Sequence, residues 1–98
     1  MNTYYIYILR NPSKMLYIGL TTDLTHILKK HKERRMTNFK ANFSFDKLIH
    51  VEEFSDVNEA IAREIELKGY NFNRKIDLFR LTNPMLKEIN NTMVHKTA

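Results

Sequence analysis

The segment YYIYILRNPSKMLYIGLTTDLTHILKKH, residues 4–31, decides the fold of this chain. Two short runs rich in tyrosine and isoleucine, residues 3–9 and 15–20, flank the sequence NPSK at residues 11–14. Asparagine, proline and serine favour turns, whereas tyrosine and isoleucine favour strands. The pattern therefore predicts a β-hairpin with a loop of a few residues.

The two faces of this predicted hairpin differ in chemistry because side chains alternate along a strand. One face is aliphatic and needs a core, while the other carries phenols that are available for chemistry. The aliphatic face holds Ile6, Ile8, Leu16, Ile18 and Leu20, and the phenolic face holds Tyr5, Tyr7, Tyr17 and Gly19.

A helix is expected to follow the hairpin directly. Thr22 and Asp23 are suitable N-cap residues, and side chains with helical spacing come next. The positions of this stripe are Leu24, Ile27, Leu28 and His31. The stripe should face the hairpin, so its last member would bring an imidazole toward the tyrosines.

The composition limits what the chain can be. Its 98 residues suffice for one small domain, which we assign to residues 1–90, with a frayed tail at 91–98. There is no cysteine, which excludes disulfides, thiolate metal sites and thiol redox chemistry. No apolar run approaches the ~18 residues of a membrane span, and the first residues lack a secretory signal pattern. A cytoplasmic protein with no membrane partner is the simplest expectation.

The middle of the chain predicts a loop and a third strand. Residues 35–44 lack periodicity and predict a mobile basic loop, whose Phe39, Phe43 and Phe45 would stack on bases or pin the loop to the core. Residues 46–54 alternate as a strand does. Ile49 and Val51 are expected on one side of that strand and Leu48, His50 and Glu52 on the other, with His50 as a structural histidine.

The C-terminal half predicts helices. Ser55 is expected to cap a helix that ends at Gly69, and Pro84 suits the first turn of a short last helix at residues 85–90. The buried stripe of the longer helix, or its border, should contain Val57, Ala60, Ile61, Glu64, Ile65 and Lys68. The whole pattern predicts an α+β fold with a small three-stranded antiparallel sheet flanked by helices, which we expect to pack on one side.

Glu64 is a candidate functional residue within that helix. Its carboxylate should lie at the edge of the buried face, where an unpaired charge is costly. Arg74 or Lys75 would be a suitable partner, whereas Arg63 and Lys68 are expected to lie too close along the helix. A divalent metal ion is the alternative partner.

The net charge of +5 favours a polyanionic partner. Most of the positive charge follows the hairpin, and it would form either a solvated helix face or a rim that binds phosphates. The basic residues of this cluster include Lys29, Lys30, Arg34, Arg35 and Lys40.

Several short motifs resemble those of the GIY-YIG nucleases, in particular the small single-domain bacterial members. Residues 5–7 (YIY) stand where that family has Gly-Ile-Tyr, and residues 17–19 are its Tyr-Ile-Gly. Residues 60–70 are similar to the family stretch A-x-x-x-E-x-x-I-K-G-W, and Asn83-Pro84 matches its Asn-Pro. One position departs: the catalytic arginine of the family falls on Ile27.

The resemblance implies a DNA endonuclease that hydrolyses phosphodiesters and reads the structure of DNA, such as branches or damage, more than its sequence. It implies catalytic roles for Tyr7, Tyr17, His31 and Glu64, with Glu64 holding one Mg²⁺ or Mn²⁺ ion. The nucleic-acid-binding residues would be Lys29, Lys30, Arg34, Arg35, Lys40, Lys68, Arg74 and Lys75.

The isoleucine at position 27 leaves two functions open. Losing one donor to the transition state costs about 10²- to 10³-fold in rate, so the enzyme would be slow. Lys30 is a candidate substitute for the arginine, although it lacks the bidentate fork. Alternatively, the chain is a catalytically impaired module that binds nucleic acid or a protein through the same basic groove.

Overall fold

The computed structural model describes residues 2–37, 45 and 47–89. The elements are β1 (Tyr4–Arg10), β2 (Leu16–Thr21), α1 (Leu24–Thr37), β3 (Lys47–Phe54), α2 (Val57–Gly69) and α3 (Phe72–Arg80). The strands form one antiparallel sheet in the order β2-β1-β3, so β1 is central. The predicted α+β class, a three-stranded antiparallel sheet flanked by helices, is confirmed.

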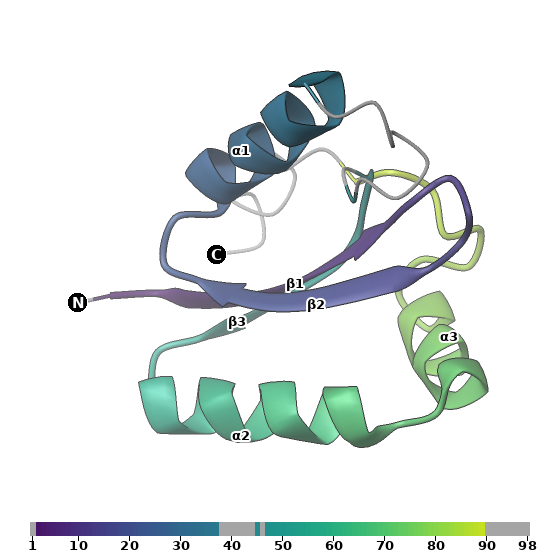
Figure 1. The fold of residues 1–98 in the computed structure, drawn as a ribbon. Helices are drawn as coiled ribbons and strands as arrows, with labels where there is room; N and C mark the ends of the chain where they lie inside the picture. The colour runs from purple at the N-terminus through teal and green to yellow at the C-terminus, as the bar shows by residue number, and fades with distance from the viewer. Residues whose placement is uncertain (1, 38–44, 46, 90–98) are drawn as a thin grey trace.

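The helices cover both faces of the sheet (Figure 1). α1 lies over one face, while α2 and α3 lie over the other. The expectation that they pack on one side is wrong because β1 is apolar on both faces. Ile6 and Ile8 point toward α2 and α3, whereas Tyr7 and Leu9 point toward α1, and all four are at most 3% exposed. A central strand of this kind needs a layer on each side.

The hairpin has the predicted faces and a tight turn. The carbonyl of Asn11 accepts a hydrogen bond from the Lys14 amide, which closes a four-residue turn around Pro12. Proline suits the second position of such a turn because its ring fixes φ. The register pairs Tyr7 with Gly19 and Leu9 with Tyr17.

α1 begins where the sequence predicts and ends later. The Asp23 carboxylate accepts a hydrogen bond from the His26 amide and caps the helix. The helix continues to Thr37, so the prediction that the basic loop starts at residue 35 is wrong. Residues 38–44, with Phe39, Phe43 and Lys40, lie outside the described part of the chain.

β3 contains an irregularity that changes which residues share a face. Its pairing with β1 shifts between Ile8 and Leu9, so that Ile8 pairs with His50 and Leu9 with Leu48. Ile49 lies in the extra position, and its side chain joins the core under α2 and α3 while Val51 packs on the α1 side. The predicted alternation is therefore wrong, because a β-bulge inserts one residue into the pattern.

α2 is oriented differently from the prediction. Asp56, and not Ser55, caps it by accepting a hydrogen bond from the Asn58 amide. Its buried residues are Ala60 and Leu67, whereas Val57, Ile61 and Ile65 are exposed. The physical reason is Arg63, which binds Glu52 of β3 and so turns its own side of the helix toward the sheet.

The segment after α3 forms turns where a last helix was predicted. Leu86 has a φ of 49°, a left-handed conformation that interrupts a right-handed helix. The Asn83 side chain donates to the carbonyls of Ile49 and Lys87, and the Ile89 amide donates to the Leu48 carbonyl. These bonds attach the segment to β3.

The assignment of residues 1–90 to one domain stays a prediction, and the tail at 91–98 lies outside the described residues. Within the described part of the chain, no helix is both long enough and apolar enough to cross a membrane.

Candidate functional site

Three aromatic side chains meet on the α1 face of the hairpin. The ring centroids of Tyr7 and Tyr17 are 6.0 Å apart, and the His31 ring lies 6.0 Å from Tyr7 and 5.3 Å from Tyr17. Both tyrosines come from the hairpin, whereas His31 comes from α1. The hairpin and helix thus bring together the three rings that the sequence predicts.

Gly19 makes this arrangement possible. A Cβ atom at this position would lie 2.3 Å from Cζ of Tyr7, closer than any real contact allows. Tyr7 and Gly19 are opposite each other on neighbouring strands, so the phenol of Tyr7 lies directly over the glycine. The φ of Gly19 is not positive, so this position needs glycine for its small size and not for its backbone conformation.

The three rings differ in their access to solvent. Tyr7 is 3% exposed and His31 is 7% exposed, whereas Tyr17 is 40% exposed. The Phe45 ring lies 5.7 Å from the Tyr17 ring and packs against the core cluster on the α1 face, so this side chain belongs to the core. Tyr17 is therefore the phenol that a large ligand can reach, and the buried rings of Tyr7 and His31 pack beside it.

Position 27 contributes an apolar side chain to the site. Ile27 is half-buried and packs against the cluster formed by Tyr7, Leu9, Leu24 and Leu48. It thus occupies the place from which a cation would approach the tyrosines. Lys30, the candidate substitute, is exposed on α1.

Glu64 lies on the other side of β2 and is paired with a lysine. Its carboxylate is 3.2 Å from Nζ of Lys68, and the side chains of Glu64 and Lys68 are 20% and 55% exposed. The expectation that Lys68 lies too close along the helix is wrong, since a glutamate four residues before a lysine has the favourable geometry. An i,i+4 pair of this kind typically contributes only about 0.3–0.5 kcal/mol, so the interaction of Lys68 with Glu64 is weak.

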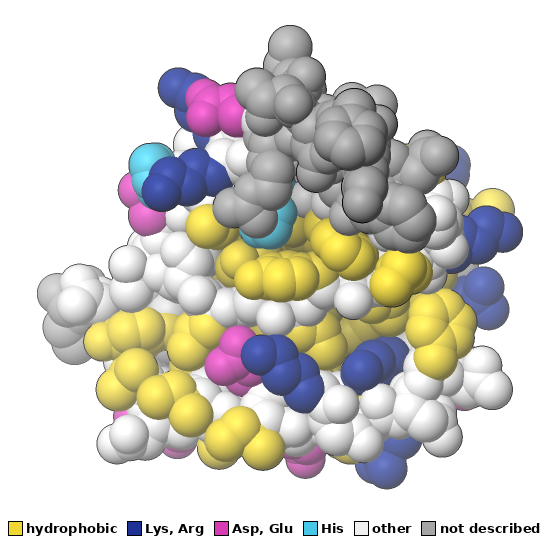
Figure 2. All heavy atoms as spheres, viewed as in Figure 1, with side chains coloured by type: hydrophobic (Ala, Val, Ile, Leu, Met, Phe, Trp, Pro, Cys, Tyr) yellow, Lys and Arg dark blue, Asp and Glu magenta, His cyan; other side chains and the backbone are white. Residues whose placement is uncertain are grey.

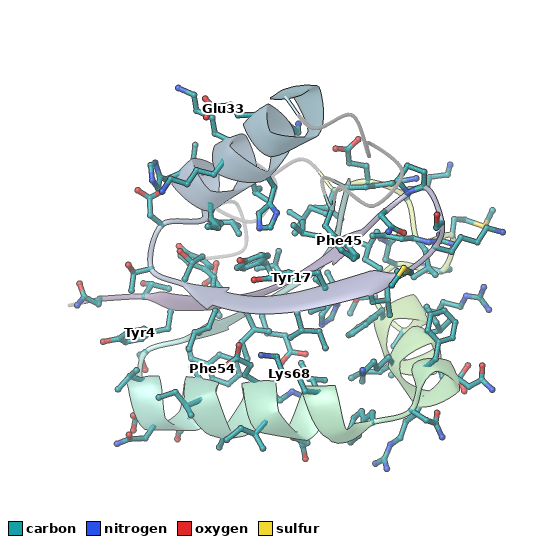
Figure 3. All side chains as sticks on the ribbon, in the orientation of Figure 1. Tyr4, Tyr17, Glu33, Phe45, Phe54 and Lys68 are labelled. Carbon is teal, nitrogen blue, oxygen red and sulfur yellow. The ribbon has the colours of Figure 1, made fainter. Side chains whose placement is uncertain are left out.

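The Glu64–Lys68 pair and the phenol of Tyr17 lie near the same edge of the sheet. Figure 3 shows Tyr17 on the α1 side of β2 and Lys68, from α2, on the opposite side. Figure 2 shows hydrophobic side chains gathered along this edge, with an acidic and a basic side chain next to each other just below them. β2 is an edge strand, so the two halves of the candidate site lie on opposite faces of the sheet at this edge.

The polar cluster of Glu52, His50 and Arg63 has a structural role. The Glu52 carboxylate accepts bonds of 2.8 and 3.1 Å from Arg63 and lies 2.9 Å from Nε2 of His50. Nδ1 of His50 lies 3.3 Å from the Thr82 hydroxyl, and its ring packs on Phe79. His50 is therefore a satisfied structural histidine that links β3 to the segment after α3, as the sequence predicts.

Hydrogen bonds shift the pKa values of Glu52 and Arg63 in this cluster. Burial opposes the charge of Glu52, but the hydrogen bonds from His50 and Arg63 outweigh it and lower the pKa of Glu52 from 4.5 to about 2. The hydrogen bond to Glu52 raises the pKa of Arg63 in return, and Glu66 adds a second partner. Arg63 is therefore bound to the sheet and does not serve Glu64.

The predicted nucleic-acid-binding residues are spread over several elements. Lys29 and Lys30 are exposed on α1, Lys68 is exposed on α2, and Lys75 is half-buried on α3. The guanidinium of Arg74 lies 3.9 Å above the centre of the Tyr70 ring, which fixes its position at the surface. The side chains of Arg34 and Arg35, and all of Lys40, lie outside the described residues.

The site suits one weakly held hard cation. Glu64 provides a single half-buried carboxylate, and no cluster of three or more potential metal ligands occurs among the described residues. Mg²⁺ is often bound by one or two carboxylates while it keeps several waters, so the residues present fit such an ion. They do not fit a metal that needs several protein ligands.

The sheet order and the placement of the helices define a small α+β domain with a cluster of aromatic rings on the α1 face. A family model described as the GIY-YIG catalytic domain matches residues 3–77. The chain belongs to the GIY-YIG family, which is of nuclease type.

Relatives of the same size support this assignment. The chain is 32% identical to a UPF0213 protein of Haloquadratum walsbyi, covering 80% of this chain and 89% of that one. It is 33% identical to the UPF0213 protein YsiG of Lactococcus lactis, covering 90% and 84%. The solution NMR structure of a UPF0213 protein from Bacillus halodurans is similar, with a TM-score of 0.56, 28% identity, and coverage of 83% of this chain and 86% of that chain.

Proposed function

We propose that this chain is a slow, divalent-metal-dependent DNA endonuclease that recognises DNA structure more than sequence. The observation that carries the proposal is the packing of Tyr7, Tyr17 and His31, with only Tyr17 exposed. A phosphodiester that lies along the β2 edge would contact the Tyr17 phenol on one side and Glu64 on the other.

Tyr17, Tyr7 and Glu64 would each have a different role in hydrolysis. Tyr17 would relay a proton from the attacking water to His31: its phenol oxygen would take the proton from the water as its own proton passes to the imidazole of His31, whose ring lies beside it. Tyr7 is buried on Gly19 and would hold Tyr17 and His31 in position. Glu64 would release Lys68 and hold a Mg²⁺ or Mn²⁺ ion, which would stabilise charge on the phosphate and the leaving oxygen.

A cleavage assay on branched and nicked DNA tests this proposal. We expect slow Mg²⁺- or Mn²⁺-dependent cleavage that is lost in Glu64→Ala and strongly reduced in Tyr17→Phe. Glu59→Ala is the matched control, because it removes an exposed carboxylate from the first turn of the same helix, and should retain cleavage. Cleavage that is equal in the wild type and Glu64→Ala would overturn the proposed role of the metal.

Two observations favour a second function, a nucleic-acid-binding module without cleavage. Ile27 fills the position of the arginine, and Glu64 is paired with Lys68. Such a module would bind DNA with an affinity that falls steeply as salt increases, since phosphate contacts release counterions. Tight, salt-sensitive binding with no cleavage in Mg²⁺ or Mn²⁺ would favour this second function.

A further inference from the structure

A basic pocket lies at the turn between β1 and β2, away from α2. It has a volume of about 270 Å³, which is room for a phosphate-sized anion and several waters at ~30 Å³ each. The residues that line it are Arg10, Asn11, Pro12, Lys14 and Lys47. Figure 1 shows the turn at the end of the sheet where α3 lies.

Among the residues that the structure describes, the lining carries three positive charges and no acidic side chain. Arg10 and Lys47 lie opposite each other in the pairing of β1 with β3, and like charges directly opposite each other repel. Within the described residues, Arg10, Lys14 and Lys47 form no ion pair. An anion in the pocket would therefore relieve repulsion that the fold leaves unbalanced.

Asn11 provides a buried donor that the described part of the chain leaves unpaired. The residue is 4% exposed, and its Oδ1 accepts a hydrogen bond of 2.8 Å from the Met15 amide. Its Nδ2, by contrast, has no hydrogen-bond partner among the described residues. A buried amide that is left unpaired is unfavourable, and an anion held by the three cations could accept from it.

Lys14 has a backbone conformation that favours glycine. Its φ is 65°, in the left-handed region, where hairpin loops of this length usually have a glycine. A lysine at this position is conformationally unfavourable, yet it adds a positive charge to the pocket.

We infer that the pocket at the β1–β2 turn binds a phosphate group, with Asn11 Nδ2 as the donor and Arg10, Lys14 and Lys47 as counter-charges. The site does not depend on chemistry at Tyr17. The phosphate would come either from a free anion or from the backbone of a nucleic acid, and only the second source rests on the proposed function.

Two variants isolate the pocket without disrupting the turn. Asn11→Asp keeps the oxygen that accepts from Met15 but replaces the amide donor with a carboxylate oxygen. Lys14→Gly removes a charge at a position that suits glycine, so the turn should remain folded. Lys32→Ala is the control, since it removes one exposed positive charge from α1, an element that does not line the pocket.

Titration with inorganic phosphate at constant ionic strength, followed by ¹H–¹⁵N NMR, tests the inference. We expect saturable shifts of the Asn11 side-chain amide and the Lys14 backbone amide, with an affinity at least tenfold weaker in Asn11→Asp and Lys14→Gly. Lys32→Ala and Glu64→Ala should bind phosphate as the wild type does. Failure of cleavage would therefore not affect this result.

A short DNA duplex as a second titrant separates the two sources. Shifts of the same amides that inorganic phosphate reverses would identify the nucleic-acid backbone as a source, whereas shifts with phosphate alone would identify a free anion. Both results support the site. Shifts no larger than those with matched NaCl, or equal phosphate affinity in Asn11→Asp, Lys14→Gly and the wild type, would overturn it.

Discussion

At the scale of single residues, Gly19 and Tyr7 depend on each other. The phenol of Tyr7 occupies the space that a side chain at position 19 would need, and Tyr7 is buried on all sides. The same phenol supports the rings of Tyr17 and His31. A change at position 19 should therefore affect both the stability of the hairpin and the shape of the site.

We predict that Gly19→Ala lowers the free energy of unfolding by about 1–3 kcal/mol, because the added methyl group overpacks a buried contact. Chemical denaturation measures this change. Gly69→Ala is the control, since nothing lies within 4 Å of its Cβ position and alanine favours helix over glycine, so this variant should be as stable or more stable. Equal stability of Gly19→Ala and the wild type would contradict the contact.

The carboxylate of Glu52 makes stability depend on pH. Its pKa is lowered from 4.5 to about 2, so the folded state binds this proton less readily than the unfolded state does. The stabilisation of the folded state by the ionised Glu52 carboxylate is therefore complete above about pH 4.5 and is lost as the pH falls toward about 2.

We predict that Glu52→Gln is less stable than the wild type at neutral pH, by on the order of 2 kcal/mol after allowance for solvent screening. The difference should shrink between pH 4.5 and pH 2, as the wild type gains its proton. Thermal or urea unfolding of both proteins across this range measures it. A difference that stays constant with pH would show that Glu52 does not carry the effect.

At the scale of elements, the apolar side chains of α2 differ widely in how much of each is buried. Leu67 is 0% exposed and belongs to the core, whereas Ile65, two residues earlier on the same helix, is 66% exposed. The orientation follows from Arg63, whose bonds to Glu52 turn its side of the helix toward β3.

We predict that Leu67→Ala lowers the free energy of unfolding by about 2–5 kcal/mol, because it removes buried methyl groups and leaves a cavity. Ile65→Ala should stay within about 0.5 kcal/mol of the wild type, since its side chain buries little. Urea unfolding of the pair measures the contrast. A large loss of stability in Ile65→Ala would mean that another surface covers this side chain.

The hairpin and α1 follow from local rules, and the sequence therefore predicts them well. Alternation assigns Tyr7 and Tyr17 to one face, and a cap at Asp23 with helical spacing brings His31 to them. The faces of β3 and α2 could not be predicted in this way. A bulge at Ile49 and an ion pair of Arg63 with Glu52 depend on contacts between distant residues.

At the scale of the whole molecule, the fold divides the candidate site between the two faces of the sheet. The rings lie under α1, and Glu64 lies on α2 on the opposite face. The sequence predicts the chemistry of both halves from their motifs. It does not predict that the two halves lie on opposite faces of the sheet, or that the register of β1 and β3 brings Arg10 and Lys47 together.

In the proposed function, position 27 determines how fast the chain cleaves DNA. Ile27 packs against the cluster that contains Tyr7, and we expect a longer side chain at this position to reach the exposed ring of Tyr17. Ile27→Met is the matched control, because it changes the packing and adds no charge. Ile27→Arg/Glu64→Ala tests whether any activity gained uses the same carboxylate.

The most direct measurement is the rate of DNA cleavage by Ile27→Arg in Mg²⁺, compared with the wild type and these two controls. We predict an increase of about 10²- to 10³-fold, the usual effect of one donor to the transition state. Ile27→Met should cleave as the wild type does, and Ile27→Arg/Glu64→Ala should not cleave. A folded Ile27→Arg protein that binds DNA and cleaves no faster than the wild type would contradict a nuclease site that lacks only its arginine.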